Sequence, residues 1–195
     1  MLEFIRGKIA ELNPTYVVID HQGLAFQVHI SLVTYAFLEG RQEAQLYLYE
    51  SIREDAWTLY GFADKAERSL FLLLISVSGV GAATARMILS SLSVAELCDA
   101  VRTGNERVLK SVKGLGTKSA QRIIVDLRDK IDQVGAGSSD AVAPVAGSAV
   151  REEALAALTM LGFAPAASGK ALDKLLQDEP GLKVEDLIKK ALKLV

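Results

Sequence analysis

The sequence is poor in the residues that form disulfides and metal sites. It has a single cysteine, Cys98, so no disulfide can form within the chain. With only two histidines, His21 and His29, it also lacks the ligand set of a usual zinc site. No apolar run approaches the about 20 residues that a membrane-spanning helix needs, and the start lacks the basic and apolar regions of a secretory signal. These absences favour a cytoplasmic protein with no membrane segment, metal or other cofactor.

Basic residues are concentrated in one part of the chain. The net charge of −2 argues weakly against a polyanionic partner. However, residues 1–63 carry 4 basic and 8 acidic side chains, residues 64–132 carry 11 and 8, and residues 133–195 carry 7 and 8. The middle third also contains a stretch, 107–122, with five basic residues and no acidic one. Such a cluster can attract a polyanion, although by itself it is more simply a solvated helix face.

The first 63 residues show the periodicity of β-strands. Leu24, Phe26, Val28 and Ile30 alternate with small or polar residues, as in a strand with one buried face. Turn-like sequences separate comparable runs. Because about five short strands in about 60 residues need a closed arrangement, a small barrel is expected. The expected strands are 2–8, 16–19, 24–30, 46–52 and 57–62.

The rest of the chain is predicted to be helical on either side of a flexible linker. Asp64 and Ser93, each with a glutamate three positions later, have the pattern of a capping box. Small, unpatterned residues at 133–147 indicate the linker. Residues 148–195 then predict three short helices that form a bundle. The expected fold class is therefore multi-domain α+β, with a β-barrel at 1–63, helices at 64–132, the linker at 133–147 and a three-helix bundle at 148–195.

Two copies of one motif lie in the basic segment. The stretch 76–88 aligns with 111–123 at an offset of 35, and 6 of 13 positions are identical, including both glycines of a Gly-x-Gly pair. A helix that ends at such a pair and restarts after a tight turn leaves free backbone amides at the start of the second helix. The helix dipole adds partial positive charge there, so the pattern predicts a phosphate site made of backbone. Small residues for close helix packing, and isoleucines on the buried side, stand at matching places in both copies: Ala85, Ala120, Ile88 and Ile123.

Other glycine motifs fit this sequence less well. A dinucleotide-binding fingerprint needs a third glycine where Thr84 and Ser119 stand, and a P-loop needs Gly-Lys-Ser/Thr. One Gly-x-Gly would most simply be a helix–helix turn. Two matching copies in the basic segment instead favour a tandem helix-hairpin-helix domain that holds the two strands of a duplex. Since few nearby side chains could read base edges, sequence-independent DNA binding is expected.

Three local sequences and the domain order resemble those of a known family. The sequences are Arg53-Glu54-Asp55 leading to Leu59-Tyr60-Gly61-Phe62, Ser78-Gly79-Val80-Gly81, and Lys113-Gly114-Leu115-Gly116-Thr117-Lys118. Over essentially its whole length the chain resembles the RuvA family of bacterial Holliday-junction-binding proteins. The resemblance implies an OB-fold first domain and a homotetramer, one or two copies of which hold the four-way junction open. It also implies a non-catalytic subunit that targets the RuvB hexameric ATPase to junctions for branch migration in recombination and DNA repair, with the RuvC resolvase as a further partner.

The resemblance also implies roles for individual residues. Glu54 and Asp55 are expected to form an acidic pin at the crossover, and Leu158, Leu161 and Phe163 to contact the motor. The chain departs from the family at Ala82 and Ala83, where many members have a basic residue after the first hairpin, and Arg86 is expected to substitute for it. The expected DNA-binding residues are Gly79, Val80, Gly81 and Arg86 at the first hairpin, and Lys113, Gly114, Leu115, Gly116, Thr117, Lys118 and Arg122 at the second.

Two other functions stay open at this level. The chain could be a nuclease or glycosylase anchored by its hairpins, but Glu54 and Asp55 are the only notable acidic pair in the DNA-facing region, and a two-metal site usually has more ligands. It could also be an interaction adaptor whose hairpins only turn the chain, in which case no salt-sensitive DNA binding would be found. From the residues alone, the acidic pair is more simply an ordinary polar hairpin tip, and Leu158 is equally a core residue of the bundle.

Overall fold

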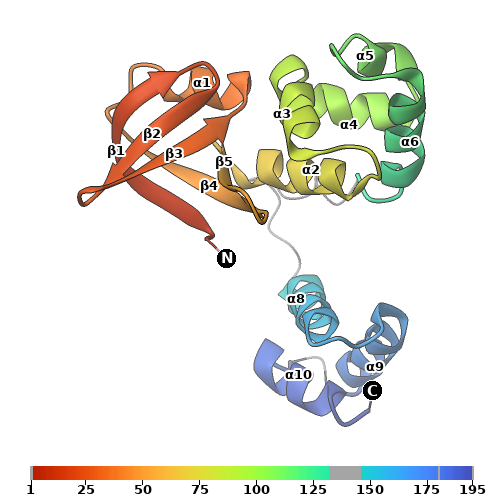
Figure 1. Ribbon diagram of the computed structural model, residues 1–195. Coiled ribbons are helices and arrows are strands. Elements are labelled where there is room, and N and C mark those ends of the chain that lie inside the picture. The colour runs from red at the N-terminus through yellow and green to blue at the C-terminus, as the bar shows by residue number, and fades with distance from the viewer. Residues whose placement is uncertain (1, 132–145, 180, 195) are drawn as a thin grey trace. The chain divides into compact units, whose positions relative to one another are not determined.

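Two separate units make up the described chain. The structure is a computed structural model that describes residues 2–131, 146–179 and 181–194 (Figure 1). The residues described up to 131 belong to one compact unit and those from 146 onward to a second. None of the helices in these ranges is long and apolar enough to cross a membrane.

Five strands close into a barrel in the first unit. Their order around the barrel is β1-β2-β3-β5-β4, in which β3 and β5 are parallel and all other neighbours are antiparallel. Alternate residues such as Val17, Ile19, Val28 and Leu46 point inward and are fully buried. This confirms the expected barrel. The strands are β1 (Phe4–Asn13), β2 (Tyr16–His21), β3 (Leu24–Ile30), β4 (Glu43–Ile52) and β5 (Trp57–Phe62).

A helix between β3 and β4 was not expected from the sequence. α1 (Leu32–Leu38) begins at Ser31, whose hydroxyl accepts a hydrogen bond from the Thr34 amide at 3.0 Å. Its position depends on partners far away in the sequence. The Leu32 amide donates to the Ser90 hydroxyl at 3.1 Å, and the Thr34 hydroxyl donates to the Glu67 carboxylate at 2.7 Å. α1 therefore joins the barrel to the helices that follow it.

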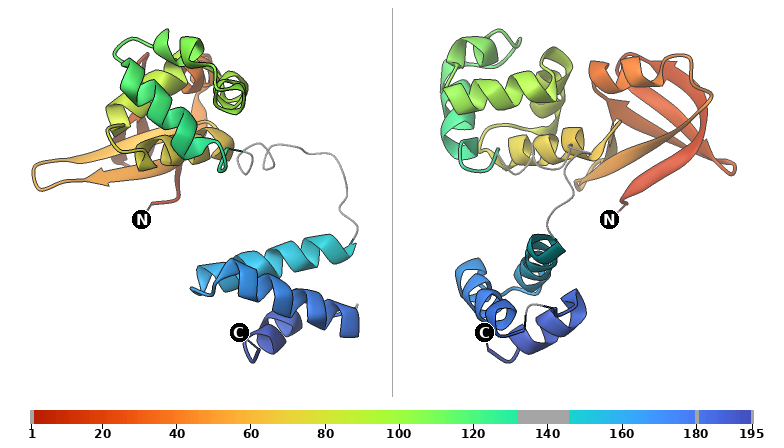
Figure 2. Two further views of the ribbon diagram at one scale, coloured as in Figure 1. Left: turned by 90° about the vertical axis from the view of Figure 1, so that its right-hand side faces the viewer. Right: turned by 180° about the vertical axis from the view of Figure 1, so that it is seen from behind.

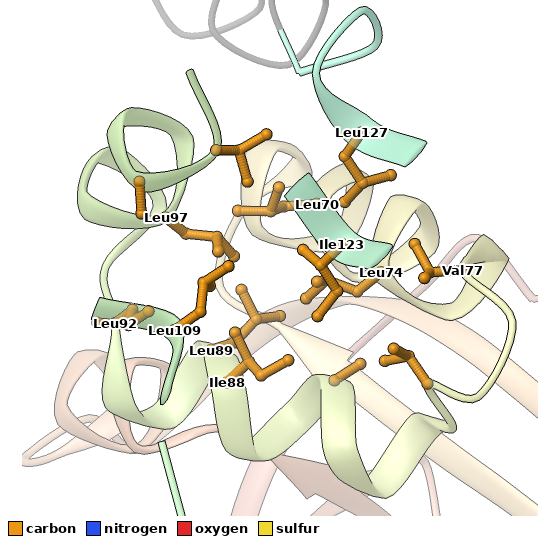
Figure 3. Packing of buried hydrophobic residues seen from close by; sticks show 14 of the residues in the cluster. Leu70, Leu74, Val77, Ile88, Leu89, Leu92, Leu97, Leu109, Ile123 and Leu127 are labelled. Carbon is orange, nitrogen blue, oxygen red and sulfur yellow. The ribbon is translucent and has the colours of Figure 1, made fainter. Parts of the chain in front are cut away.

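The helices after the barrel surround one hydrophobic core. Figure 3 shows leucine, isoleucine and valine side chains from all five of these helices or their ends pointing toward one another. Ala85, Ala120, Ile88 and Ile123 are fully buried in this core, as the repeat predicted. The predicted capping box of Ser93 and Glu96 is also confirmed. The helices are α2 (Lys65–Ser76), α3 (Ala82–Ser91), α4 (Val94–Thr103), α5 (Glu106–Lys110) and α6 (Thr117–Leu127).

The barrel and the helical domain share a packed interface. Phe71 of α2 lies against three aromatic rings of β4 and β5, with ring centroids 5.3 Å from Tyr49, 5.4 Å from Tyr60 and 4.8 Å from Phe62. Such contacts contribute about 0.5–1.5 kcal/mol each beyond the area that they bury. The two domains predicted at 1–63 and 64–132 therefore lie in a single unit.

Glu67 is buried at this interface rather than completing a capping box. Asp64 does cap α2, since its carboxylate accepts a hydrogen bond from the Glu67 amide at 2.8 Å. The Glu67 carboxylate, however, accepts hydrogen bonds from the hydroxyls of Ser31 and Thr34 and from the Ala63 amide. The capping box predicted for Glu67 is thus wrong, because its side chain is used to hold α1 against α2.

The second unit is the expected bundle of three helices. Its core consists of Ala154, Leu158, Leu172, Leu187 and Ala191, all fully buried. The expected end of the first helix at Gly162 is confirmed, because α8 ends at Met160 and Gly162, two residues later, has a φ of 94°. The helices are α8 (Ala146–Met160), α9 (Pro165–Asp178) and α10 (Val184–Ala191).

The predicted linker is shorter at its C-terminal end than expected. α8 begins at Ala146, so positions 146 and 147 are helical rather than part of the linker. Alanine is a strong helix former, which makes it a natural first residue for this helix. The remainder of the predicted linker, 133–145, lies outside the described residues.

Candidate nucleic-acid interface

The two hairpins of the repeat have the same backbone conformation. Gly79 and Gly114 have φ values of 89° and 86°, which side chains rarely tolerate. In the first hairpin the Val80 amide donates to the Val77 carbonyl at 3.0 Å, and in the second the Leu115 amide donates to the Val112 carbonyl at 3.1 Å. The side chains of Val80 and Leu115 are buried in the core. The middle residue of each hairpin therefore closes the turn and anchors it, and its amide is already used.

The second glycine of each hairpin is not required by backbone conformation. Gly81 and Gly116 are the N-caps of α3 and α6, with ordinary extended φ values of −88° and −76°. A Cβ at either position would meet no atom within 4 Å. Neither glycine supplies a side-chain cap, and neither helix has an acidic residue in its first turn. The first amides of both helices are thus left without a side-chain cap, and the positive dipole ends there favour an anion over a cation.

The second hairpin adds cationic side chains to the backbone site. Lys113 and Lys118 are exposed on either side of the Gly114–Gly116 turn. Arg122, one turn further along α6, donates through Nη1 to the Ser78 carbonyl of the first hairpin at 3.3 Å. A shallow depression joins the two hairpins and is lined by Ser78, Gly79, Lys118, Ser119, Gln121 and Arg122. The structure therefore brings the two halves of the repeat together in one basic surface.

Arg86 lies against the barrel instead of beside the first hairpin. Its Nη1 donates to the Thr15 carbonyl at 2.8 Å and lies 3.4 Å from Nδ1 of His29. The half-buried site lowers the pKa of His29, first by desolvation and then through the charge of Arg86. This arrangement gives no support to the expectation that Arg86 replaces the basic residue absent at Ala82 and Ala83, and its part in DNA binding stays a prediction. If the first hairpin binds an anion, its backbone amides are the expected donors.

The acidic pair occupies the tip of a protruding hairpin. Glu54 and Asp55 lie in the turn between β4 and β5, which the Arg53 amide closes by donating to the Ala56 carbonyl at 2.8 Å. Both carboxylates are exposed. Figure 2 shows the β4–β5 hairpin extending beyond the body of the first unit. Two exposed apolar residues that the sequence reasoning missed, Ile52 and Trp57, flank this tip.

The three residues expected to contact a motor differ in accessibility. Leu158 is fully buried in the core of the bundle, so the prediction that it forms part of an exposed contact is wrong. Leu161 is 61% exposed, and Phe163 is half-buried after the turn at Gly162. Met160 is 89% exposed and was not foreseen. The apolar surface at this end of α8 therefore consists of Met160 and Leu161, with Phe163 beside them in sequence.

Models of known families match three successive parts of the chain. The model of the RuvA N-terminal domain matches residues 1–61. A SAM-like helix-hairpin-helix tandem matches residues 71–129, and the RuvA C-terminal domain matches residues 149–195. A curated relative from Bacteroides fragilis, Holliday junction branch migration complex subunit RuvA, is 56% identical over 99% of both chains.

The chain belongs to the RuvA family. Relatives with the same description are 49% identical in Parabacteroides distasonis, over 100% of both chains, and 44% identical in Christiangramia forsetii, over 99% of both. The part of the chain that matches the helix-hairpin-helix tandem contains both hairpins, and the part that matches the RuvA N-terminal domain contains the acidic turn. The resemblance seen in the sequence is thereby confirmed, together with the mixed α+β fold of barrel, hairpin tandem and C-terminal helices.

Proposed function

We propose that this RuvA-family chain binds four-way DNA junctions without regard to sequence and acts as the non-catalytic subunit of a branch-migration complex. The observation that carries the proposal is the pair of matching hairpins, which line one shared depression and are each followed by a helix without a side-chain N-cap. The relatives are described as subunits of the Holliday junction branch migration complex, which agrees with it.

Each hairpin is proposed to bind one phosphate of a DNA arm. At the first, the amides of Gly79, Gly81 and the start of α3 supply the donors. At the second, Gly114, Gly116, Thr117 and the start of α6 do so, with the ammonium groups of Lys113 and Lys118 nearby. Arg122 lies where it can bind a phosphate while it links the two hairpins. Because phosphates are the same at every base pair, these contacts position the protein on DNA and read no sequence.

The acidic turn is proposed to lie at the centre of the junction. Four copies of the chain, one for each arm, would place four copies of Glu54 and Asp55 around the crossover. These carboxylates repel phosphates, so the strands are kept apart there and can exchange partners. The position of the pair at the tip of a protruding hairpin supports this role (Figure 2). One such homotetramer on one face of the junction, or two on opposite faces, would satisfy this arrangement.

The C-terminal bundle is proposed to bind the RuvB ATPase. Its apolar surface at Met160 and Leu161 has the exposure that a docking contact needs, and Phe163 can extend it. Leu158 is excluded from the contact because it is buried. In this scheme the first unit recognises the junction, the second recruits the motor, and the RuvC resolvase acts on the same junction.

A competition gel shift tests the proposed function. A labelled four-way junction, bound by the full-length protein, is challenged with unlabelled linear duplex of the same arm sequences. We expect the junction complex to survive a large excess of duplex, and to dissociate as salt is raised because phosphate contacts are lost. If duplex competes equally, the chain is a general DNA anchor and the tetrameric scheme is wrong. If labelled DNA is cleaved when magnesium is added, the chain is a nuclease rather than a non-catalytic subunit.

A further inference from the structure

Two large apolar side chains are exposed beside the acidic turn. Ile52 and Trp57 are directly opposite each other on β4 and β5, as the last pair of the ladder before the turn. Ile52 is 73% exposed and Trp57 is 61% exposed. The pair thus stands between the closed barrel and the two carboxylates of Glu54 and Asp55.

Strand register explains where this pair points. Residues two apart on a strand face the same side of the sheet. Leu48 on β4 and Leu59 on β5 point into the barrel and are buried. Ile52 and Trp57 continue these two rows beyond the end of the barrel, where no core remains to receive them. At this place polar side chains would be equally compatible with the hairpin, so the fold alone does not account for an indole.

The neighbouring charges restrict what the pair can bind. Glu54 and Asp55 immediately beyond it repel phosphate groups and outnumber the one cation of the turn, Arg53, so a DNA backbone is disfavoured here. A nucleobase is flat and uncharged, and stacking on an aromatic ring is open to every base because each has a π-face. Apolar side chains that enter between bases also act as wedges in other DNA-binding proteins. A base exposed at a break in stacking therefore fits both the indole and the carboxylates.

We propose that Trp57, supported by Ile52, stacks on bases that are exposed at the open centre of a four-way junction. This inference rests on the proposed function, since only a junction held open offers such bases beside the acidic turn. The two carboxylates keep the sugar-phosphate backbone away, and the indole receives the bases that separate from their neighbours. The turn would then hold bases in an intermediate position between the old pairing and the new one.

Intrinsic fluorescence provides a direct test, because Trp57 is the only tryptophan of the chain. Full-length protein is titrated with a four-way junction and, separately, with linear duplex of the same arm sequences. We expect the emission of Trp57 to be quenched by the junction and unchanged by duplex. If a gel shift shows that the junction is bound in preference to duplex but the emission does not change, this inference is wrong while the proposed function stands. If emission changes on dilution without DNA, the pair contacts a second copy of the chain and the inference is also wrong.

Variants measure what the stacking contributes. Trp57→Ala should weaken junction binding by about 5- to 150-fold, as expected for the loss of a stacked base, and should leave duplex binding unchanged. Trp57→Phe keeps an aromatic ring and should retain most of the affinity. Leu24→Ala is the matched control, because Leu24 is 65% exposed beside a different turn, and it should bind as the unchanged protein does. Equal junction affinity for Trp57→Ala and the unchanged protein would refute the inference.

A fluorescent base locates the contact on the DNA. A junction with 2-aminopurine at the crossover should change its emission when the unchanged protein or Trp57→Phe binds, and much less when Trp57→Ala binds. When 2-aminopurine is placed in the middle of an arm instead, its emission should change by the same amount with all three proteins. A crossover signal that is identical for all three proteins would show that the exposed pair only stabilises the hairpin, as cross-strand pairs can.

Discussion

Replacing Gly116 with aspartate should strengthen helix α6 and weaken DNA binding at the same time. Gly116 is the N-cap of α6, its φ of −76° is accessible to any residue, and a Cβ there meets nothing within 4 Å. Aspartate is among the preferred N-cap residues because its carboxylate accepts hydrogen bonds from the first free amides of the helix. Those amides are the donors that we assign to a DNA phosphate.

The two effects have opposite signs and separable magnitudes. The cap and its favourable interaction with the helix dipole should raise the free energy of unfolding by about 0.5–1 kcal/mol. A hydrogen bond to a charged group contributes about 1.5–3 kcal/mol, so the loss of one at this hairpin should weaken DNA binding by about 10- to 150-fold. Repulsion between the new carboxylate and the phosphate adds to this loss. A variant that is more stable and binds less well cannot be explained by misfolding.

The assay pairs urea unfolding with a DNA titration at one fixed salt concentration. Ser93→Asp is the matched control, because Ser93 is the N-cap of α4 and the substitution changes the charge by the same amount. Ser93 lies beyond the C-terminal end of α3, while the first hairpin precedes its N-terminal end. The control should therefore bind DNA nearly as well as the unchanged protein. If Gly116→Asp is folded and binds DNA with unchanged affinity, no phosphate approaches the start of α6 and the hairpin assignment is wrong.

Three further predictions concern single side chains in the two units. Lys118→Ala should lower the slope of the logarithm of the DNA binding constant against the logarithm of salt by about 0.9, and an unchanged slope would mean that Lys118 contacts no phosphate. Burial raises the pKa of Glu67, although the hydrogen bonds from the Ser31 and Thr34 hydroxyls and from the Ala63 amide oppose this rise. The contribution of Glu67 to the free energy of unfolding is therefore present below its unfolded pKa and is lost as the pH rises through its folded pKa. In urea unfolding, Glu67→Gln should therefore gain stability relative to the unchanged protein as the pH rises above about 4, the ordinary range of a free glutamate, and a difference that does not vary with pH would contradict this. Leu158→Ala should cost about 2–5 kcal/mol and unfold the bundle, seen by circular dichroism, whereas Leu161→Ala should change stability by less than about 0.5 kcal/mol and weaken RuvB binding.

Features that depend on neighbours in the chain were predictable. The two hairpins were found from an offset of 35 and the Gly-x-Gly spacing, and the alternation at 24–30 predicted a strand that the structure contains. The capping box at Ser93 and Glu96 was also recognisable. Strand pleating, helix capping and tight turns are set by residues a few positions apart, and such interactions are visible in a sequence.

Features that depend on packing between distant segments were not predictable from the sequence. Glu67 has the spacing of a capping box, but hydroxyls 36 and 33 residues earlier in the chain take its carboxylate. Arg86 follows the first hairpin in sequence, yet a carbonyl of the barrel 71 residues away receives its guanidinium. In both cases a long-range partner takes the side chain instead of a local one. For Glu67 the reason is burial, because a buried polar group must be satisfied by whatever lies nearest in space.

The burial of apolar residues was also only partly predictable from the sequence. Leu158 and Leu161 lie three positions apart and belong to the same apolar pattern, but one is fully buried and the other is 61% exposed. Their burial differs because α9 and α10 cover only part of α8. Trp57 continues the inward row of β5 and would be a core residue if the barrel extended one pair further. Periodicity tells which side of an element is apolar, whereas burial also requires a second element to cover that side, and that depends on how the whole chain packs.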